Sequence, residues 1–586
     1  MFFSAYLGSP EHKTQWREAL NRHAAWLGLT AHPFARALAD GRIFEYGWVS
    51  LRPPDTNALV REEGGALTII PLDTLTRAEA LEQSSPRGFE TNAIRMDVSL
   101  ASGEVRVAVP VLTVEQFYHA NIGGDWVFGN DLRLMLRWAG LRLDDLAAYA
   151  FLQWGFEPSP LTISQTVRRV SPGCRLVLRP ASGVSEERLF DPGELRYADR
   201  DTSDADELMR EALDAVLSRV PLPALMHFSG GVDSGLMAAR LAAMGRTDVR
   251  LQNFSHGARD SFRDVAPAMA AHLRFPFERV EWDPSQIMPA LNDLAREYTS
   301  PFADAATIPT IMLVRAMRET GPLRSYLEGT AAASLLEWGL HYPLRRIIYG
   351  IPRPLRQAGA ALYRAGLWRY EKPWVRPFAA LQTSVQMPLF HTMQTTMGGY
   401  AYRVPPELQR RLFEVLAEGL TAVSLGLDPR DRFSLQSLVR FGAHFSAMRG
   451  FDPMRRRGLL PVFPFMEPPV VRAGFSLTWE QKYEGKVLKV PLKRLLARSV
   501  PAEWVYWPKG AFVLPFQAVF THPDMRAFWA DVALSPRNPL LGYCREERVR
   551  NVLRCAQAGE YLHSGARKFL WGFTFISAWL SQLEAQ

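Results

Sequence analysis

A six-residue loop constrains the fold of this chain more than any other feature. Residues 229–234 read Ser-Gly-Gly-Val-Asp-Ser, after the short apolar run 224–228 and before a stretch with helical spacing. Such a loop between a buried strand and a helix suits phosphate, because glycine lets the backbone approach an anion and the helix N-terminus offers amide hydrogens and a positive dipole. Asp233 is the expected magnesium ligand, and Ser229 and Ser234 offer hydroxyls to phosphate oxygens.

The segments after the loop predict a parallel α/β domain over 203–586. A helix expected to begin at Gly235 and end at Gly245 leads into a second apolar run, 249–254. This βαβ pattern predicts a parallel sheet with its ligand at the carboxyl ends of the strands. The remainder is expected to be mainly helical, from helical spacing at 308–317, 408–417, 434–448, 491–499 and 569–583.

The first 195 residues predict a separate β-rich domain. Short alternating segments punctuated by turns occur at 47–51, 67–71, 105–109 and 126–129. Residues 144–153 have helical spacing, and the polar stretch 191–204 reads as a linker. The predicted fold class is therefore α/β, with a β-rich domain followed by a parallel-sheet domain with many helices.

Composition narrows the function classes. The chain has 586 residues, too many for one core, and 47% apolar residues. Its net charge of +8 suits ATP or an acidic substrate but is spread too thinly for a nucleic-acid tract. The one dense basic cluster, 455–457, fits a solvated turn or a phosphate contact equally well. Three cysteines suggest a reducing compartment, and no apolar run approaches ~18 residues, so a cytoplasmic protein without a membrane span is expected.

The loop lacks the Gly-Lys-Ser/Thr ending of the Walker type. It resembles the signature of the pyrophosphatase-loop enzymes, which split ATP into AMP and pyrophosphate while adenylating a substrate oxygen. Segments 459–467 and 507–512 resemble two motifs of the asparagine synthetase family, and 128–133 and 160–173 resemble its amidotransferase half. The resemblance implies an αββα amidotransferase-like domain over 1–195 and an ATP-pyrophosphatase synthetase domain over 203–586.

Two departures from the family pattern are informative. Glutamine-dependent members place a catalytic cysteine directly after the initiator methionine, and here that position is Phe2. A chain without glutaminase chemistry must take its amine from the substrate, as β-lactam synthetases and lasso-peptide macrocyclases do. The lasso cyclases fit better, on the chain length, the degenerate segment 464–467 and an aromatic- and Arg-rich insertion near 340–400 that could receive a peptide.

The second departure concerns the metal. The family's acidic motif Gly-Xaa-Gly-Xaa-Asp-Glu corresponds to residues 326–336, with Ala333 where the Asp is expected. Three explanations stay open. Asp233 and the phosphates suffice, a nearby carboxylate substitutes, or the chain is an impaired form. The carboxylates that could substitute are Glu328, Glu337 and Asp304.

The resemblance implies a complete reaction. An Asp or Glu side chain of a leader-free precursor peptide is adenylated and joined to the peptide's N-terminal amine, with ATP and Mg²⁺ as cofactors. Lys509, which matches the family's lysine, would neutralise charge on the α-phosphate and on the tetrahedral oxyanion. The residues expected to bind ATP are Ser229, Gly230, Gly231, Asp233, Ser234, Asn253, Phe254, Ser255, Gly329 and Thr330. Candidates for the general base are Glu467, His341 and Tyr342.

The lasso assignment implies the precursor peptide, a leader peptidase and a leader-binding protein as partners. Three alternatives remain open: a β-lactam synthetase-like intramolecular amide synthetase, a tRNA-modifying pyrophosphatase-loop enzyme, and a degenerate scaffold that binds ATP without turnover. The tRNA enzymes would show a basic RNA-binding appendage or paired cysteines, and neither is visible in the sequence. Ala333 keeps the scaffold under consideration.

Overall fold

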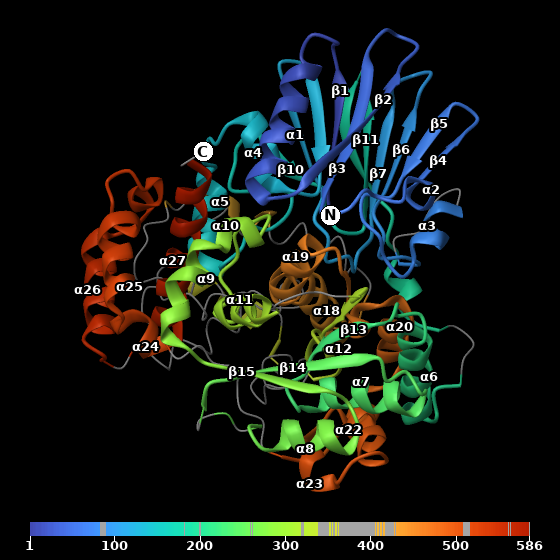
Figure 1. Cartoon of the computed structure of the whole chain (residues 1–586), viewed down its shortest axis with the longest axis vertical. Coiled ribbons are helices and arrows are strands. Elements are labelled where there is room, and N and C mark those ends of the chain that lie inside the picture. The colour runs from blue at the N-terminus through green and yellow to red at the C-terminus, as the bar shows by residue number, and fades with distance from the viewer. Residues whose placement is uncertain are drawn as a thin grey trace.

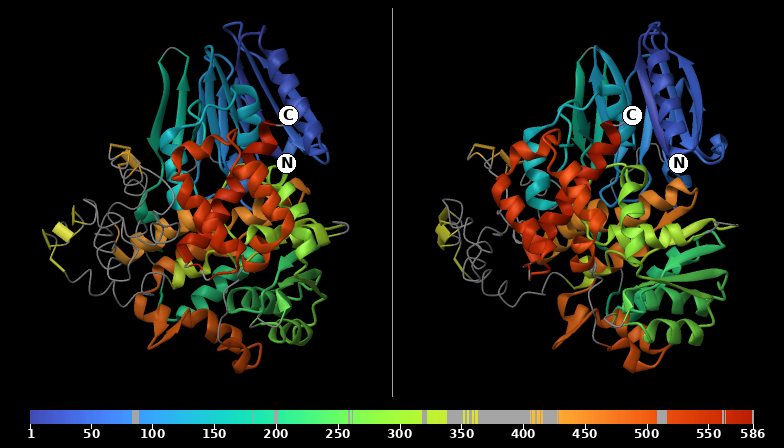
Figure 2. Two further views of the ribbon diagram at one scale, coloured as in Figure 1. Left: turned by 90° about the vertical axis from the view of Figure 1, so that its left-hand side faces the viewer. Right: turned by 60° about the vertical axis from the view of Figure 1, so that its left-hand side comes forward.

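The computed structural model describes 1–82, 89–180, 182–197, 201–257, 260, 262–317, 322–337, 427, 429–507, 516–560, 562 and 564–584, with short pieces between 351 and 415. A β-rich N-terminal part lies at one end of the molecule in every view of Figures 1 and 2. An α/β part forms the other end, and the C-terminal helices between residues 516 and 584 pack beside both (Figure 1). The predicted α/β class is confirmed.

The N-terminal part consists of two six-stranded antiparallel sheets. The first has the order β10-β8-β9-β1-β3-β2 and the second β12-β11-β7-β6-β5-β4. The strands of the first sheet are β1 (Phe2–Gly8), β2 (Thr30–Ala37), β3 (Ile43–Ser50), β8 (Tyr118–Ile122), β9 (Asp125–Gly129) and β10 (Val167–Arg169). Those of the second are β4 (Val60–Glu63), β5 (Ala66–Ile69), β6 (Arg95–Ser99), β7 (Val105–Val109), β11 (Cys174–Arg179) and β12 (Gly183–Arg188).

Alternation along β1 explains how these layers stack. Phe3, Ala5 and Leu7 lie in the core between the two sheets, whereas Phe2 and Tyr6 lie in the core beneath the helices. Helices α1 (Lys13–Leu27) and α4 (Leu132–Ala139) cover that second face. The first strand therefore contributes to both cores, and this fixes its register strongly.

The second part is built on a five-stranded parallel sheet of order β15-β14-β13-β16-β17. Its strands are β13 (Ala224–His227), β14 (Val249–Ser255), β15 (Phe277–Glu281), β16 (Ser325–Leu327) and β17 (Leu460–Val462). Helices α6 (Ala205–Leu217), α7 (Val232–Ala243) and α22 (Val490–Ala497) pack together on one side (Figure 1), and α11 (Thr307–Ala316) packs against β14 and β15. The predicted parallel βαβ unit is confirmed.

Several boundaries differ from those expected. Helix α7 begins at Val232 rather than Gly235, so Asp233 and Ser234 lie in its first turn. The expected helix over 434–448 is divided into α18 (Pro429–Gln436), a π-helical segment (Ser437–Ser446) and the start of α19 (Met448–Arg456). Only scattered residues of 408–417 are described.

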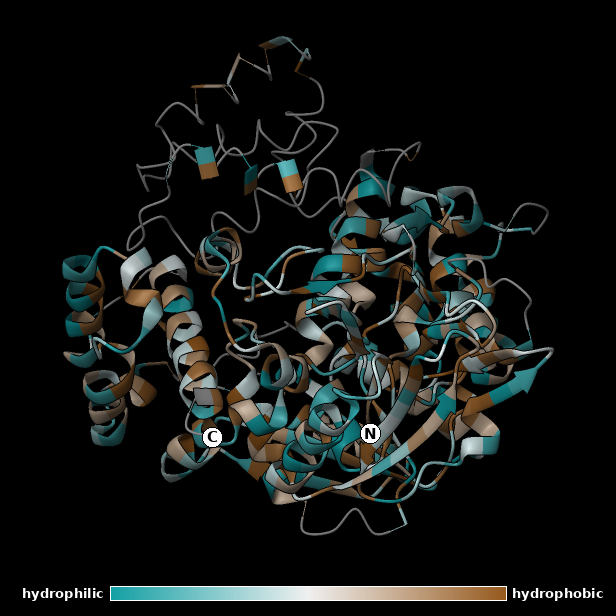
Figure 3. Cartoon of the chain, turned by 90° about the horizontal axis from the view of Figure 1, so that it is seen from above, coloured by the Kyte–Doolittle hydropathy of each residue, from teal (hydrophilic) through white to brown (hydrophobic). Residues whose placement is uncertain are grey.

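The C-terminal helices are α24 (Phe516–Thr521), α25 (Pro523–Phe528), α26 (Glu546–Gln557) and α27 (Ser564–Glu584). Hydrophobic and hydrophilic residues occupy different faces of the helices at the left of Figure 3, and in α26 the buried residues Val549, Leu553 and Ala556 recur at helical spacing. Within the described ranges, no helix is long and apolar enough to cross a membrane.

Candidate active site

The glycine-rich loop has the shape that a phosphate cradle requires. Gly230 has φ +76, and a Cβ at this position would lie 2.8 Å from the Cβ of Ala266, so both conformation and space demand glycine. The Ser229 and Ser234 hydroxyls lie 3.1 Å apart, and the Gly231 amide donates to Ser229 Oγ at 3.2 Å. Gly231 is the N-cap of α7, so the positive end of the helix faces the loop.

A cavity of about 670 Å³ opens at the carboxyl ends of the parallel strands. Most of the expected nucleotide-binding residues line it, namely Ser229, Gly231, Asp233, Ser234, Asn253, Phe254, Gly329 and Thr330. Ser255 lies outside this lining: it is fully buried and its hydroxyl accepts from the Gly257 amide at 3.2 Å, whereas Gln252 and His256 line the cavity. Gly230 lies behind the lining and shapes the loop against Ala266.

Lys489 is the principal site residue that the sequence analysis missed. Its ammonium Nζ lies 2.8 Å from both carboxylate oxygens of Asp233 and 3.4 Å from Glu337 Oε2. Burial lowers the pKa of Lys489, but Asp233 and Glu337 outweigh it and hold the pKa above its ordinary value, so the lysine is charged. It precedes α22 with a left-handed φ of 56. The available signal was the spacing of Lys486, Lys489 and Lys493, all of which line the cavity.

The residues present fit a magnesium ion bound together with ATP. No group of three His, Cys, Asp or Glu side chains that could hold a metal occurs in the part of the chain that the structure describes. Mg²⁺, however, usually takes one or two carboxylates plus substrate phosphates, and Asp233 and Glu337 meet at the cavity. Glu337 follows Ala333 by one helical turn at the end of α12 (Ala332–Leu336), so it presents a carboxylate on the same face.

Glu328, a second carboxylate considered for the metal, belongs to a different cluster. Its Oε1 accepts from Thr330 Oγ1 at 2.6 Å and from Arg449 Nη2 at 3.2 Å, and its Oε2 accepts from the Tyr326 hydroxyl at 2.6 Å. Asp304, the third, pairs with Arg449 at 3.5 Å. Among the contacts between described residues, Glu337 is the one of these three carboxylates that shares a partner with Asp233.

The structure describes Glu467, one of the three proposed bases, but not the other two or the proposed catalytic lysine. Glu467 is buried outside the cavity lining, and burial raises its pKa to about 7. It lies next to Met466, whose carbonyl accepts from Asn92 Nδ2 of the N-terminal part at 3.1 Å, so it belongs to the contact between the two parts. Lys509, His341 and Tyr342 lie outside the described residues, as does nearly all of the insertion at 340–400.

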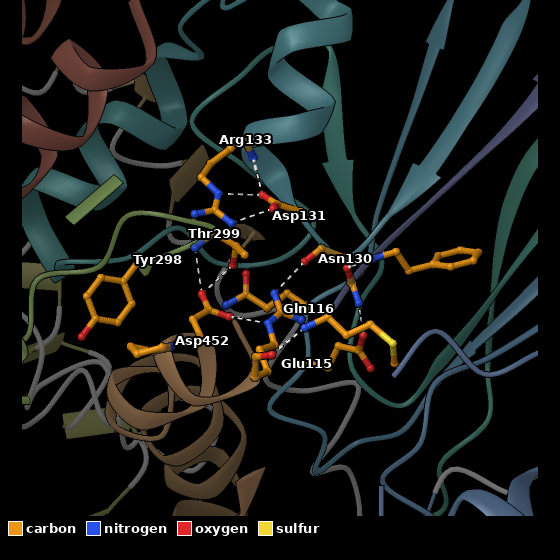
Figure 4. A network of polar contacts seen from close by, with 12 residues as sticks. Glu115, Gln116, Asn130, Asp131, Arg133, Tyr298, Thr299 and Asp452 are labelled. Carbon is orange, nitrogen blue, oxygen red and sulfur yellow. Dashed lines mark hydrogen bonds and ion pairs between the residues drawn. The ribbon is translucent and has the colours of Figure 1, made fainter. Parts of the chain in front are cut away.

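The position of the family's nucleophilic cysteine is filled by an aromatic ring. Arg133 and Arg455 place their guanidinium carbons 5.0 and 4.6 Å from the centroid of the Phe2 ring. Figure 4 shows the polar network around this point, in which the Asn130 side chain accepts from the Phe3 amide at 2.7 Å and Asp131 pairs with Arg133. A phenyl side chain has no group that could attack an amide, so Phe2 itself cannot act as a nucleophile.

Both interpretations of the basic cluster at 455–457, a solvated turn and a phosphate contact, are wrong. Its arginines contact other segments of the protein. Arg455 is buried and donates to the Asn130 carbonyl at 3.1 Å, and Arg456 donates to the Leu27 carbonyl at 2.8 Å. Arg456 and Arg457 both pair with Glu297. These arginines join the N-terminal part to α19 and the segment before α11.

Comparisons with known proteins agree with this geometry. Residues 204–581 match the family model described as asparagine synthase. The chain is 26% identical over 474 residues to a putative glutamine-hydrolyzing asparagine synthetase of Mycobacterium tuberculosis (strain H37Rv), covering 74% of this chain and 66% of that protein. It is 24% identical over 212 residues to asparagine synthetase 1 of Bacillus subtilis (strain 168), covering 34% and 32%. The matches thus span between one third and just under two thirds of these relatives.

Among solved structures, the chain is similar to glutamine phosphoribosylpyrophosphate amidotransferase from B. subtilis in complex with ADP and GMP. The likeness covers 56% of this chain and 82% of that one, at 10% identity and a TM-score of 0.22. A similarity this low carries no argument about the site.

Proposed function

The chain belongs to the asparagine synthase family, and from that premise we propose that it is an ATP-dependent enzyme that forms amide bonds through an acyl adenylate. A carboxylate does not react with an amine because its leaving group would be oxide, whereas a mixed anhydride with AMP has a good leaving group. The observation that carries the proposal is the cavity in which the phosphate loop, Asp233 and Lys489 meet.

Each of these groups has a part in binding the nucleotide. The loop from Ser229 to Ser234 and the N-terminus of α7 offer amides and hydroxyls to the phosphates. Asn253 and Phe254 line the cavity at the end of β14, where the adenine is expected. Asp233 and Glu337 would hold Mg²⁺, which neutralises phosphate charge when it is bound. Lys489 supplies a buried positive charge beside them.

The finer proposal is that the amine belongs to the substrate itself. Phe2 occupies the position where a glutamine-dependent enzyme needs a thiolate, and its ring is packed between two arginines. The acid would then be an Asp or Glu side chain of a leader-free peptide, and the amine the N-terminus of the same peptide, giving the macrolactam of a lasso peptide. A leader peptidase and a leader-binding protein would deliver this substrate.

Pyrophosphate and AMP release by the purified full-length chain tests the proposal. The substrates are Mg·ATP and a panel of synthetic peptides with a free N-terminal amine and one internal Asp or Glu at successive positions. Peptide-stimulated AMP formation together with a product lighter by one water supports a cyclase. AMP formation without cyclisation of any peptide keeps the family chemistry but rejects the lasso substrate, stimulation only by tRNA supports the modifying enzyme, and no AMP under any condition supports the scaffold.

Two variants test the assigned residues. Asp233→Asn and Lys509→Ala are each expected to abolish AMP formation while the circular dichroism spectrum stays that of the wild type. Glu547→Gln, an exposed change on α26, is the matched control and should keep full activity. Normal turnover in both variants would remove the site assignment.

A further inference from the structure

A buried cluster of basic side chains lies where the N-terminal part meets the α/β part. Arg440 and His444 come from the π-helical segment, and Arg169 comes from the end of β10. Their side chains are buried, with exposed fractions of 2%, 4% and 2%. None of the three lines the cavity at the phosphate loop, although Gly442 and Ser446 of the π-helical segment do. The cluster is therefore separate from the site proposed for the nucleotide.

The two parts of the molecule pack closely beside this cluster. Helix α5 (Asp145–Trp154) ends at Gly155, whose carbonyl accepts from the Ala303 amide at 2.7 Å. A Cβ at Gly155 would lie 2.8 Å from the Cβ of Ala303 and 3.5 Å from the ring of Phe445, the residue after His444. The loop that follows α5 is thus held against the π-helical segment. Such segments are rare and are frequently found at functional sites.

The loop after α5 supplies one carboxylate, and that carboxylate belongs to Arg169. Arg169 Nη1 donates to the Glu157 carbonyl at 2.8 Å, and Arg169 Nη2 lies 3.6 Å from Glu157 Oε2. Arg169 Nε is buried and has no acceptor among the described residues. Burial raises the pKa of Glu157 to about 7, although Arg169 acts to lower it, so this carboxylate supplies at most one negative charge.

Arg440 has no counter-ion in the part of the chain that the structure describes. Its Nε and Nη1 are buried there without an acceptor. Burial and then the charge of Arg169 lower the pKa of Arg440 to about 9, so the guanidinium is charged at neutral pH. His444, four residues along, also has a buried Nδ1 without a partner. Burial, Arg169 and Arg440 hold the pKa of His444 well below its ordinary value, so its ring is neutral and its Nδ1 can carry a hydrogen.

The charges of this cluster do not balance. Arg440 and Arg169 carry two positive charges against at most one on Glu157, at atoms that solvent does not reach. A buried charge without a partner is strongly destabilising, and an opposite charge with hydrogen bonds offsets that cost. The unpartnered nitrogens of Arg440, Arg169 and His444 can all donate, which selects an anion over a cation. Because these nitrogens are enclosed, the anion has to be small.

We propose that a small inorganic anion, with the charge and size of chloride, binds between Arg440, Arg169 and His444 and joins the N-terminal part to the π-helical segment. The two arginines supply the positive charge, and the imidazole supplies a further N–H donor. Glu157 stays paired with Arg169. Because the site is separate from the phosphate loop, this inference stands or falls independently of the proposed function.

The stability of the wild type in chloride tests the proposal. The full-length chain is purified in sodium gluconate and then melted by scanning calorimetry as sodium chloride replaces gluconate at constant ionic strength. An anion that binds only the folded protein raises the melting temperature, by at least about 2 °C when chloride is 100-fold above its dissociation constant. Bromide, which resembles chloride and scatters X-rays anomalously, should give a peak beside Arg440 in crystals of the same chain.

Arg440→Met removes the charge that the anion neutralises and leaves Arg169 balanced by Glu157. Replacement of a buried charge by an apolar side chain of similar volume is often neutral or stabilising. The variant should therefore fold, with a melting temperature that no longer responds to chloride. Arg537→Met, at an exposed arginine, is the matched control and should respond to chloride as the wild type does.

Two results would overturn the proposal. A chloride response of the same size in the wild type and in Arg440→Met would reflect a general salt effect instead of a site. Bromide crystals without an anomalous peak at the cluster would also reject it, and this measurement decides the question if Arg440→Met does not fold. An anomalous peak beside Arg440, with a chloride response lost in Arg440→Met and kept in Arg537→Met, supports the site.

Discussion

At the scale of single residues, the charge of Lys489 is what allows two carboxylates to face one phosphate-binding cavity. The lysine side chain is only 6% exposed and lies between Asp233 and Glu337. Lys489→Met would leave these carboxylates unpaired and remove a cation from the phosphate end. We expect Mg·ATP to bind at least about 10-fold more weakly, or about 1.4 kcal/mol, by isothermal titration calorimetry.

Lys482→Met is the matched control for this prediction. Lys482 is also buried, but its ammonium lies 4.0 Å from the Trp479 ring centroid and does not line the cavity. Its loss should lower the melting temperature without changing the affinity for Mg·ATP. Equal affinities of the wild type and Lys489→Met would contradict the role given to Lys489.

Gly329 permits a close approach that the Cβ of any other residue would crowd. An added Cβ would lie 3.2 Å from Asp233 Cβ and 3.3 Å from the Ser234 amide nitrogen, so the first turn of α7 would have to move. We expect Gly329→Ala to weaken Mg·ATP binding several-fold and to cost about 1–3 kcal/mol in the free energy of unfolding. Titration calorimetry and differential scanning calorimetry measure the two effects.

The control for this change is Gly542→Ala, because an added Cβ there meets no atom within 4 Å. It should leave both quantities unchanged within about 0.5 kcal/mol. A Gly329→Ala variant with unaltered nucleotide affinity would show that the loop tolerates the displacement.

These residues also show where sequence reasoning stops. The motif at 229–234 fixed the chemistry of the cradle, because strand, glycines and helix are neighbours in the chain. Glu337 could only be offered as one of three substitutes for the missing carboxylate at Ala333, since choosing among them requires knowing which one meets Lys489 in space. Lys489 lies 256 positions from Asp233 in the sequence, so no local sequence pattern predicts their pairing.

At the scale of elements, α19 links the cavity to the N-terminal part. Its first turn carries Arg449 at Glu328, and its last turn carries Arg455 and Arg456, which donate to carbonyls of the N-terminal part. Between them, Asp452 accepts from the amide and hydroxyl of Thr299 at 2.8 and 2.7 Å and lies 3.0 Å from Arg455 Nε. Figure 4 shows the dashed lines that join Asp452 to Thr299.

Asp452→Asn tests the importance of this link. The change would leave the Arg455 guanidinium buried without its carboxylate, and breaking a buried pair typically costs about 3–5 kcal/mol. We expect a loss of about 3 kcal/mol by scanning calorimetry and a weaker affinity for Mg·ATP, because α19 also holds Arg449. Asp524→Asn, at a side chain 65% exposed, should change neither. Loss of stability with full nucleotide affinity would show that α19 does not couple the two regions.

Helix α19 also shows why the environment of the arginines at 455–457 was predicted wrongly from the sequence. Three consecutive arginines are typical of a solvated surface, and charge pattern alone gives no reason to bury them. Burial becomes favourable here because Glu297 and the carbonyls of Leu27 and Asn130 arrive from distant segments. The strands and most helices were predictable because their periodicity is local, whereas this interface depends on pairings between separate domains.

At the scale of the whole molecule, the N-terminal part makes a buried contact with the α/β part that carries the cavity. Asn92 donates to the Met466 carbonyl across this contact, and Glu467 lies next to it with a pKa raised by burial to about 7. The ordinary pKa of this carboxyl is 4.5. The folded protein therefore holds a proton that the unfolded chain loses between pH 4.5 and 7, so stability from this group is present at low pH and is lost as pH rises through 7.

Glu467→Gln replaces the carboxyl with a neutral group of the same shape. At pH 5 wild type and variant should melt at nearly the same temperature, because Glu467 is already protonated in the folded state. At pH 8 the variant should be more stable by up to about 3 kcal/mol, the free energy that corresponds to a pKa raised from 4.5 to about 7. Scanning calorimetry of the full chain at both pH values measures this, with the exposed Glu503→Gln as control. A stabilisation of the same size at pH 5 and pH 8 would show that titration of Glu467 does not govern the contact between the two parts.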